Sequence, residues 1–167
     1  MKDIRRKEVQ LELVFSGAVI LDDRKNPSKV LLQDSLSFHP IFGKNATRQT
    51  KFPGGTNKNH REDSTPVDTL RRELFEETGL VLRAEVEPIE IFSRYRKGVK
   101  TRFYLLYLED FDGKIRTEEA DDPPDKLFPP EWVLLMEAGR KLTLRSVYQE
   151  VLMIVLRRLG LVGYSAS

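Results

Sequence analysis

The sequence contains no cysteine and only two histidines, His39 and His60. The absence of cysteine excludes disulfide bonds, thiolate nucleophiles and cysteine-ligated zinc or iron–sulfur sites. Both histidines stand in polar segments, where we expect surface residues without a catalytic role. A metal bound by this chain is therefore expected to have mainly oxygen ligands.

Long hydrophobic runs are also absent. No stretch approaches the roughly 18 uninterrupted apolar residues of a membrane-spanning helix. The first ten residues are charged and lack the apolar centre of a secretory signal. The sequence therefore predicts no membrane partner and a cytoplasmic location.

Neither sign of charge dominates the chain. It has 28 Lys and Arg against 26 Asp and Glu, and the basic residues are spread out instead of forming the stripe of a dedicated nucleic-acid-binding protein. With 167 residues, 40% of them hydrophobic and 32% charged, the composition is that of one soluble globular domain. An anionic small molecule fits this charge as well as a nucleic acid does, and a nucleic-acid partner is not favoured.

Apolar, β-rich segments precede, separate and follow two helical patterns. We expect a β-hairpin over residues 11–33 and a C-terminal helix over residues 142–159. Three further strands are expected between them, over residues 80–92, 101–109 and 131–136. Residues 34–51 and 110–130 are expected to be loops. This order predicts an α/β (α+β) domain in which helices pack on a sheet.

The most clearly delimited element is a helix predicted over residues 66–78. Thr65 is expected to be its N-cap, with Pro66 in the first helical position and Asp68 completing a capping box. Gly79 follows the last helical residue and can adopt the left-handed backbone conformation that ends many helices.

Three glutamates of this helix lie on one side of it. With about 100° between successive residues, Glu73, Glu76 and Glu77 share an arc of roughly 100° beside the buried stripe that contains Leu70 and Leu74. Like charges at these spacings repel, so a bound cation is the simplest explanation for them. Carboxylate oxygens are hard ligands and favour Mg²⁺ or Mn²⁺ over zinc.

Two further features accompany the glutamates. Arg72 precedes Glu76 by four positions, which allows its guanidinium to brace that carboxylate. Residues 52–55 read Phe-Pro-Gly-Gly, a sequence that requires a turn with unusual backbone angles.

These residues carry a resemblance to a known family. Residues 72–80, RELFEETGL, resemble the second half of the Nudix box, REUxEExGU with U aliphatic, and residues 52–55 resemble the glycine turn that opens it. Average residue frequencies give this nine-residue pattern by chance in on the order of one chain in a hundred thousand. The chain is thus similar to the Nudix (MutT-like) hydrolases, and the box is the specific part of the resemblance.

The resemblance implies a Nudix-type α/β/α sandwich with a mixed β-sheet. It implies a single Nudix hydrolase domain over residues 1–167, with the box at 54–80. The implied activity is that of a pyrophosphatase in which water attacks a phosphorus of a nucleoside diphosphate linked to another moiety, NDP-X, with magnesium or manganese as cofactor. The partner is then a nucleotide-derived small-molecule substrate, and the oligomeric state is open, with a homodimer among the alternatives.

The resemblance also assigns roles to individual residues. Glu76 and Glu77 become metal ligands, Glu73 a ligand or catalytic carboxylate, and the carbonyl of Gly54 a further ligand. Arg72 becomes the residue that positions them.

A general base for the attacking water is expected from Glu73 or from the acidic segment that follows the last central strand. The candidates in that segment are Glu118, Glu119, Asp121 and Asp122. Glu119 is our choice, because members of the family often use a glutamate from this loop.

The box departs from the family pattern in one place. The segment between the second glycine and Arg72 is about three residues longer than in the family, with the extra residues around 56–64, and Ser64 stands where the family has a glutamate. Glu62 or Asp63 could reach the same region from this insertion.

Two alternatives stay open. One is a Nudix-fold nucleotide-binding module with weak or no catalysis, which the Ser64 departure supports and the intact glutamates oppose. The other is an RNA 5'-end pyrophosphohydrolase, which would require residues 94–102 to form a basic lip around Tyr95. We expect a solvated turn there, and we expect Trp132 to pack in a strand instead of stacking on a base.

Overall fold

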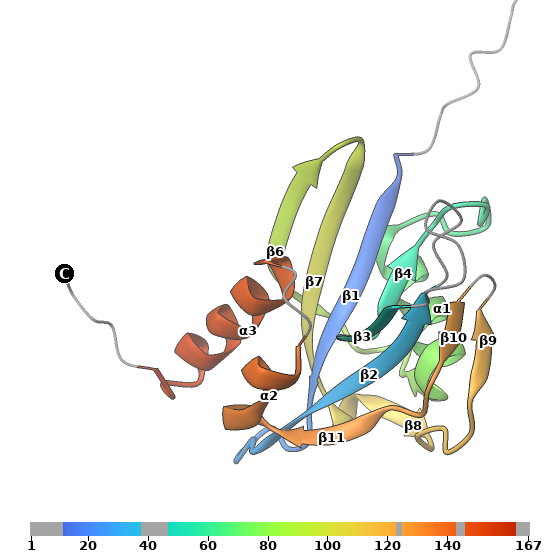
Figure 1. Ribbon diagram of the computed structural model, residues 1–167. Helices are drawn as coiled ribbons and strands as arrows, with labels where there is room; N and C mark the ends of the chain where they lie inside the picture. Colours follow the sequence, from blue (N-terminus) through green and yellow to red (C-terminus); the bar gives the residue numbers. More distant parts are fainter. Residues whose placement is uncertain (1–11, 38–46, 123–124, 143–145, 163–167) are drawn as a thin grey trace, which may run out of the picture.

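The computed structural model describes residues 12–37, 47–122, 125–142 and 146–162 (Figure 1). His39 and the centre of the expected loop 34–51 lie outside these residues.

The centre of the fold is strand β1 (Val14–Leu21), which is buried along nearly all of its length. It pairs in parallel with β7 (Val99–Tyr107) from end to end, and β7 pairs antiparallel with β6 (Ile89–Arg96). On its other side β1 pairs antiparallel with β2 (Lys29–Ser37), at Leu21 and Val30 next to the hairpin turn. The sheet is therefore mixed, as the sequence predicted.

Beyond the hairpin turn, β1 and β2 diverge and the sheet forks (Figure 1). Strand β3 (Thr47–Lys51) pairs with β2, whereas β4 (Gly54–Thr56) pairs with β1. Phe52 and Pro53 thus carry the chain from one arm of the fork to the other. The glycine turn singled out in the sequence lies at this crossing.

Short strands complete the two arms. β10 and β11 both pair with β2, and β9 pairs with β10. β5 and β8 form a separate pair, and a 3-10 turn immediately precedes β8. Their bounds are Leu80–Leu82 for β5, Leu108–Asp110 for the 3-10 turn, Phe111–Gly113 for β8, Ala120–Asp122 for β9, Asp125–Leu127 for β10 and Glu131–Leu134 for β11.

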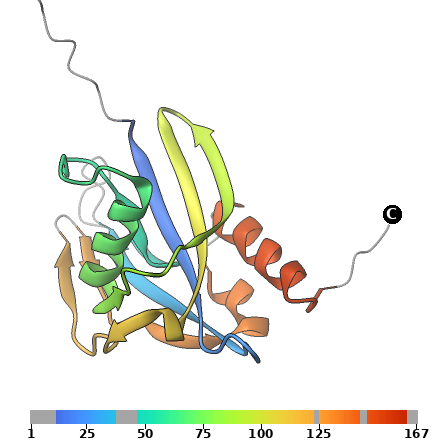
Figure 2. The same cartoon turned by 180° about the vertical axis from the view of Figure 1, so that it is seen from behind.

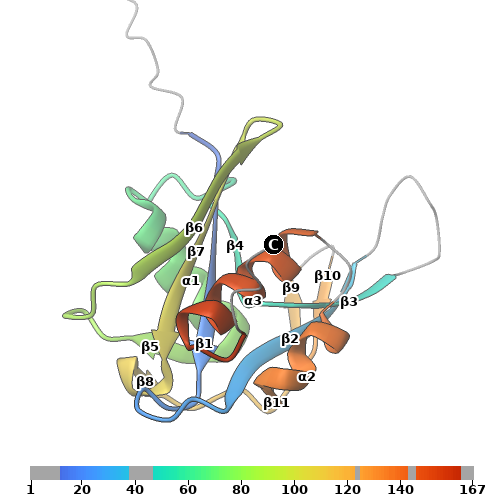
Figure 3. The ribbon, with the colours of Figure 1, turned by 90° about the vertical axis from the view of Figure 1, so that its left-hand side faces the viewer.

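Helices cover both faces of the sheet (Figure 2 and Figure 3). α1 (Pro66–Thr78) packs on one face in a core that includes Ala18 and Ile20, whereas α2 (Leu135–Lys141) and α3 (Ser146–Arg158) close a core on the other face. Neighbouring residues of β1 thus belong to opposite cores, and the fold is the predicted α/β/α sandwich. None of the helices among the described residues combines the length and the hydrophobicity of a membrane-spanning helix.

Helix α1 has the predicted bounds and the predicted caps. The Thr65 hydroxyl accepts a hydrogen bond from the Asp68 N–H at 3.1 Å, and the Asp68 carboxylate accepts one from the Thr65 N–H at 2.8 Å. Gly79 ends the helix with φ at 78°. Residues within a few positions of each end, the capping box and Gly79, thus define the bounds of the helix that carries the glutamates.

Four expectations about the other elements were wrong. The strand expected over 80–92 is two strands of different sheets, β5 and β6, because the backbone turns at residues 83–86. The loop expected over 110–130 contains β8, β9 and β10, and the loop expected over 34–51 contains β3. The strand expected over 131–136 ends at Leu134, and α2 begins at Leu135. Elements this short have too few residues to show a periodic pattern.

Candidate functional site

Glu77 connects α1 to the glycine turn at the fork of the sheet. Its side chain is 2% exposed, and its Oε2 accepts a hydrogen bond from the Gly54 N–H at 2.6 Å. Its Oε1 accepts one from Lys51 Nζ at 2.6 Å, and the same ammonium lies 3.5 Å from the Gly54 carbonyl oxygen. Burial alone would lower the pKa of Lys51, but the neighbouring Glu77 carboxylate outweighs it and raises that pKa.

Both glycines of the turn are required by close packing. A Cβ on Gly54 would lie 2.4 Å from the Ser16 carbonyl oxygen, and the residue has φ at +148°, which other residues rarely adopt. A Cβ on Gly55 would lie 2.4 Å from the carboxyl carbon of Glu73. The turn therefore lies directly against the carboxylates of α1.

Glu73 lies one helical turn before Glu77 and is 8% exposed. Arg72 Nη1 donates to its Oε1 at 2.8 Å. Burial, followed by the charge of Glu77, nevertheless raises the pKa of Glu73 to about 7. The arrangement therefore disfavours the charged carboxylate in the absence of a further cation.

Arg72 braces more than the predicted Glu76. Its Nη1 also donates to Glu76 Oε2 at 3.1 Å, and its Nη2 donates to the Thr56 carbonyl oxygen at 2.9 Å. The predicted contact with Glu76 is confirmed, and the guanidinium also contacts Glu73 and the preceding loop, because its several donors lie between them.

The insertion supplies Arg72 with an acidic partner. Asp63 Oδ2 accepts from Arg72 Nη2 at 2.8 Å and from the Thr69 hydroxyl at 3.1 Å, and its side chain is 5% exposed. Burial raises the pKa of Asp63, but the hydrogen bonds from Arg72 and Thr69 outweigh it, so that the pKa is lowered. Of the two candidates in the insertion, Glu62 instead pairs with His60 in an exposed position.

Glu76 lies at the rim, with its side chain 51% exposed. A cavity of about 460 Å³ opens here and is lined by all three glutamates. The other lining residues are His60, Phe75, Arg116, Ala120 and Leu127. Arg116 also donates to the Glu76 carbonyl oxygen. His60 and Arg116 could not be predicted from a sequence motif, because the folding of the loops places both of them beside the helix.

Among the described residues, no three acidic or histidine side chains converge as closely as a preformed metal site requires. Lys51 and Arg72 instead lie between the carboxylates and pair with them. The donor set still fits a hard divalent ion, because its atoms are carboxylate and carbonyl oxygens. The ammonium of Lys51, held by Glu77 near the Gly54 carbonyl, marks a position that attracts cations.

Glu119, the predicted base, stands immediately before β9. Its carboxylate pairs with Lys126 at 2.5 Å and is about half exposed. Ala120, the next residue, lines the cavity of the glutamates. Glu118 is exposed, and the side chains of Asp121 and Asp122 lie outside the described residues. The role of Glu119 thus stays a prediction.

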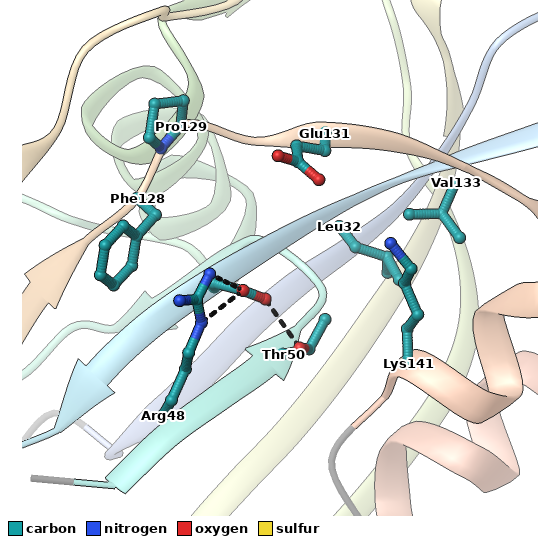
Figure 4. Close-up of a pocket in the computed structure, with 9 residues that line it drawn as sticks. Leu32, Arg48, Thr50, Phe128, Pro129, Glu131, Val133 and Lys141 are labelled. Carbon is teal, nitrogen blue, oxygen red and sulfur yellow. Dashed lines mark hydrogen bonds and ion pairs between the residues drawn. The ribbon is translucent and has the colours of Figure 1, made fainter.

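A second cavity, of about 390 Å³, lies on the opposite face of β2 (Figure 4). Gln33 donates to the Glu77 carbonyl oxygen on the α1 face, so the next residue, Asp34, points to the other face. There Asp34 pairs with Arg48 and accepts from the Thr50 hydroxyl, and the Arg48 guanidinium lies 4.6 Å from the centre of the Phe128 ring. Acidic and basic groups balance in this cavity, which is separate from the glutamates.

The segment 94–102 forms the ends and turn of the β6–β7 hairpin. Tyr95 is 63% exposed, while Arg94 pairs with Glu150 and Arg102 pairs with Glu90. These acidic partners reduce the charge available for a basic lip. Trp132 packs against the core beneath α1, which confirms its predicted structural role.

Comparisons with known proteins agree with this fold. A family model described as the NUDIX domain matches residues 14–153. A search of curated proteins found no match.

Several solved structures share the fold. A MutT structure described for Aliivibrio salmonicida and Vibrio cholerae has 16% identity and a TM-score of 0.60, over 87% of this chain and 98% of that one. The MutT NUDIX hydrolase of Burkholderia pseudomallei has 21% identity and a TM-score of 0.55, over 85% and 96%. The NUDIX domain of Shewanella oneidensis NrtR, solved with ADP-ribose, has 20% identity and a TM-score of 0.57, over 89% and 88%.

Proposed function

The chain belongs to the Nudix family, and we propose that it is a Mg²⁺- or Mn²⁺-dependent pyrophosphohydrolase that cleaves a phosphoanhydride bond in an NDP-X substrate. The observation that carries this proposal is the buried carboxylate of Glu77. It accepts a hydrogen bond from the Gly54 N–H and pairs with the Lys51 ammonium. A carboxylate is rarely buried in this way unless a positive charge binds it.

We assign the metal to Glu73, Glu76 and Glu77 together with the Gly54 carbonyl. The bound ion supplies charge neutralisation at the phosphate oxygens and the leaving group. Arg72 fixes the carboxylates of Glu73 and Glu76, and Asp63 fixes Arg72. The four carboxylates of this cluster, those of Asp63, Glu73, Glu76 and Glu77, pair with only two cations, Lys51 and Arg72. Even with Arg116, which lines the same cavity, acidic groups outnumber basic ones, so the cluster favours an added cation.

Removal of a proton from the attacking water requires a base within hydrogen-bond reach. Glu73 lines the cavity, and burial followed by the charge of Glu77 raises its pKa to about 7 in the metal-free protein. Glu119 could act as the base only after its ion pair with Lys126 breaks. The two residues are the candidates for this role, and Glu119→Gln distinguishes them, because a large loss of kcat in that variant requires Glu119 at the reacting water.

The alternative of a nucleotide-binding module without turnover is less favoured. Its support was Ser64 in place of the family glutamate, and Asp63 provides Arg72 with a carboxylate from the insertion. The second alternative, an RNA 5'-end enzyme, is weakened by the paired arginines of the β6–β7 hairpin.

A metal-dependent hydrolysis screen tests the proposal. The panel contains nucleoside triphosphates, ADP-ribose, nucleotide sugars, dinucleoside polyphosphates and triphosphate-capped RNA, each with Mg²⁺, Mn²⁺ or chelator. We expect Glu77→Gln to lose about a hundredfold or more in kcat/KM while it stays folded, and the exposed Glu137→Gln to match the wild type. Binding without turnover by the wild type, or full activity in Glu77→Gln, would contradict the proposal.

A further inference from the structure

Lys51 forms an ion pair with Glu77, and the Nudix box assigns it no role. We propose that Lys51 is a substrate-binding residue that is exchanged for the metal: its ammonium neutralises Glu77 in the metal-free protein and binds the substrate diphosphate when a divalent ion occupies Glu77. This inference rests on the proposed function.

The position of the ammonium is the first observation. Glu77 Oε2 is held by the Gly54 N–H, so Oε1 is the oxygen that faces a cation, and Lys51 Nζ lies 2.6 Å from it. The Gly54 carbonyl, the other proposed metal ligand of the turn, lies 3.5 Å from the same ammonium. Lys51 therefore contacts the two atoms that a metal would bind.

Electrostatics then require an exchange. The Lys51 side chain is 16% exposed and that of Glu77 is 2% exposed, so water screens the two charges poorly. An ammonium and a divalent ion at the same carboxylate oxygen would repel strongly in such surroundings. Binding of the metal must therefore move the ammonium away from Oε1.

The fold offers the displaced ammonium a place beside the cavity. Lys51 and Gln33 are direct partners in the β2–β3 register, so their side chains share the α1 face. Gln33 is 1% exposed, and its Oε1 has no hydrogen-bond partner. A buried acceptor without a donor is costly, and Lys51 is a donor within cross-strand reach. A diphosphate bound by the metal at Glu77 would offer the same ammonium its negative oxygens.

The first test measures metal binding without substrate. The electron paramagnetic resonance signal of free Mn²⁺ reports the Mn²⁺ affinity of the full chain. We compare this affinity for the wild type and three variants, Lys51→Met, Lys51→Arg and Lys25→Met. We expect Lys51→Met to bind Mn²⁺ about tenfold more tightly, because the competing charge is gone. Lys51→Arg keeps the charge and should stay close to the wild type, as should Lys25→Met, which removes an exposed charge from the β1–β2 turn. Unchanged or weaker Mn²⁺ binding in Lys51→Met would overturn the exchange.

The second test measures turnover at saturating Mn²⁺ with the best substrate of the screen. We expect Lys51→Met to raise KM about tenfold or more, and Lys51→Arg to restore most of the loss, because the diphosphate loses and regains a positive partner. A KM equal to that of the wild type in Lys51→Met would overturn the role in substrate binding. If the wild type hydrolyses nothing in the screen, the proposed function fails, while the Mn²⁺ titration still decides whether Lys51 competes with the metal.

Discussion

At the scale of single residues, the site depends on atoms packed too closely to allow substitution. Gly55 is the clearest case, because its missing side chain makes room for the carboxylate of Glu73. The neighbouring Gly54 differs, since a Cβ there would meet backbone atoms of β1 that cannot move aside.

We predict that Gly55→Ala folds but loses activity. The new Cβ would lie 2.4 Å from the end of a flexible side chain, so Glu73 moves and the backbone stays. The expected loss is about tenfold or more in kcat/KM, with little change in melting temperature. Gly54→Ala is the matched comparison and should lose about 2 kcal/mol or more of stability, because of its positive φ and the backbone clash. Equal activity of Gly55→Ala and the wild type would contradict the described packing.

The pair of Asp63 and Arg72 predicts how stability depends on pH. The pKa of Asp63 in the folded chain is below its ordinary value of 3.8, so the pair stabilises the fold above about pH 4 and loses this contribution as the pH falls further. We expect Asp63→Asn to be less stable than the wild type by about 2 to 4 kcal/mol near pH 7. The gap should shrink toward pH 3 in urea unfolding measured at several pH values. A gap that grows at acidic pH would contradict the pairing.

At the scale of elements, α1 is defined by its own sequence. Its capping box, its Pro66 start and its Gly79 end all involve residues within a few positions of one another, which is why its bounds could be predicted. The strands at the fork are different. β3, β8, β9 and β10 have three to five residues each. β3 and β10 pair with β2, and β8 pairs with β5, across longer stretches of sequence, and only the pair of β9 and β10 is local.

Removal of the N-cap tests the local definition of α1. We predict that Thr65→Ala lowers the free energy of unfolding by about 1 kcal/mol, because the Asp68 N–H loses its acceptor. The folded fraction should keep kcat/KM within about twofold of the wild type, since Thr65 lies at the opposite end of the helix from Glu77. Thr117→Ala, at an exposed loop position, serves as the control in thermal and urea unfolding. Equal stability of the two variants would show that the cap contributes nothing.

At the scale of the whole molecule, the site lies where the sheet forks. β3 brings Lys51 from one arm, β4 brings the glycines from the other, and α1 brings the glutamates against both (Figure 1). The sequence predicted the glutamates, Arg72 and the glycine turn, because they form a local pattern. It did not predict Lys51, Arg116 or the choice of Asp63 over Glu62, because their contacts depend on how distant segments fold together.

Metal binding to this site should stabilise the entire chain. A ligand that binds only the folded state at a hundred times its Kd adds about 2.7 kcal/mol. For a chain of this size we expect a rise in melting temperature of about 5 to 10 °C with Mn²⁺ relative to chelator. Glu77→Gln should show little of this rise. An equal rise in the variant would place the stabilising metal elsewhere.

We propose above that a hard divalent ion binds between α1 and the glycine turn. The most direct measurement is the anomalous X-ray signal of Mn²⁺ in crystals of the full chain. We predict a peak in contact with Glu77 and the Gly54 carbonyl oxygen, with Lys51 Nζ moved away from Glu77. A peak remote from the three glutamates, or none at millimolar Mn²⁺, would contradict the account.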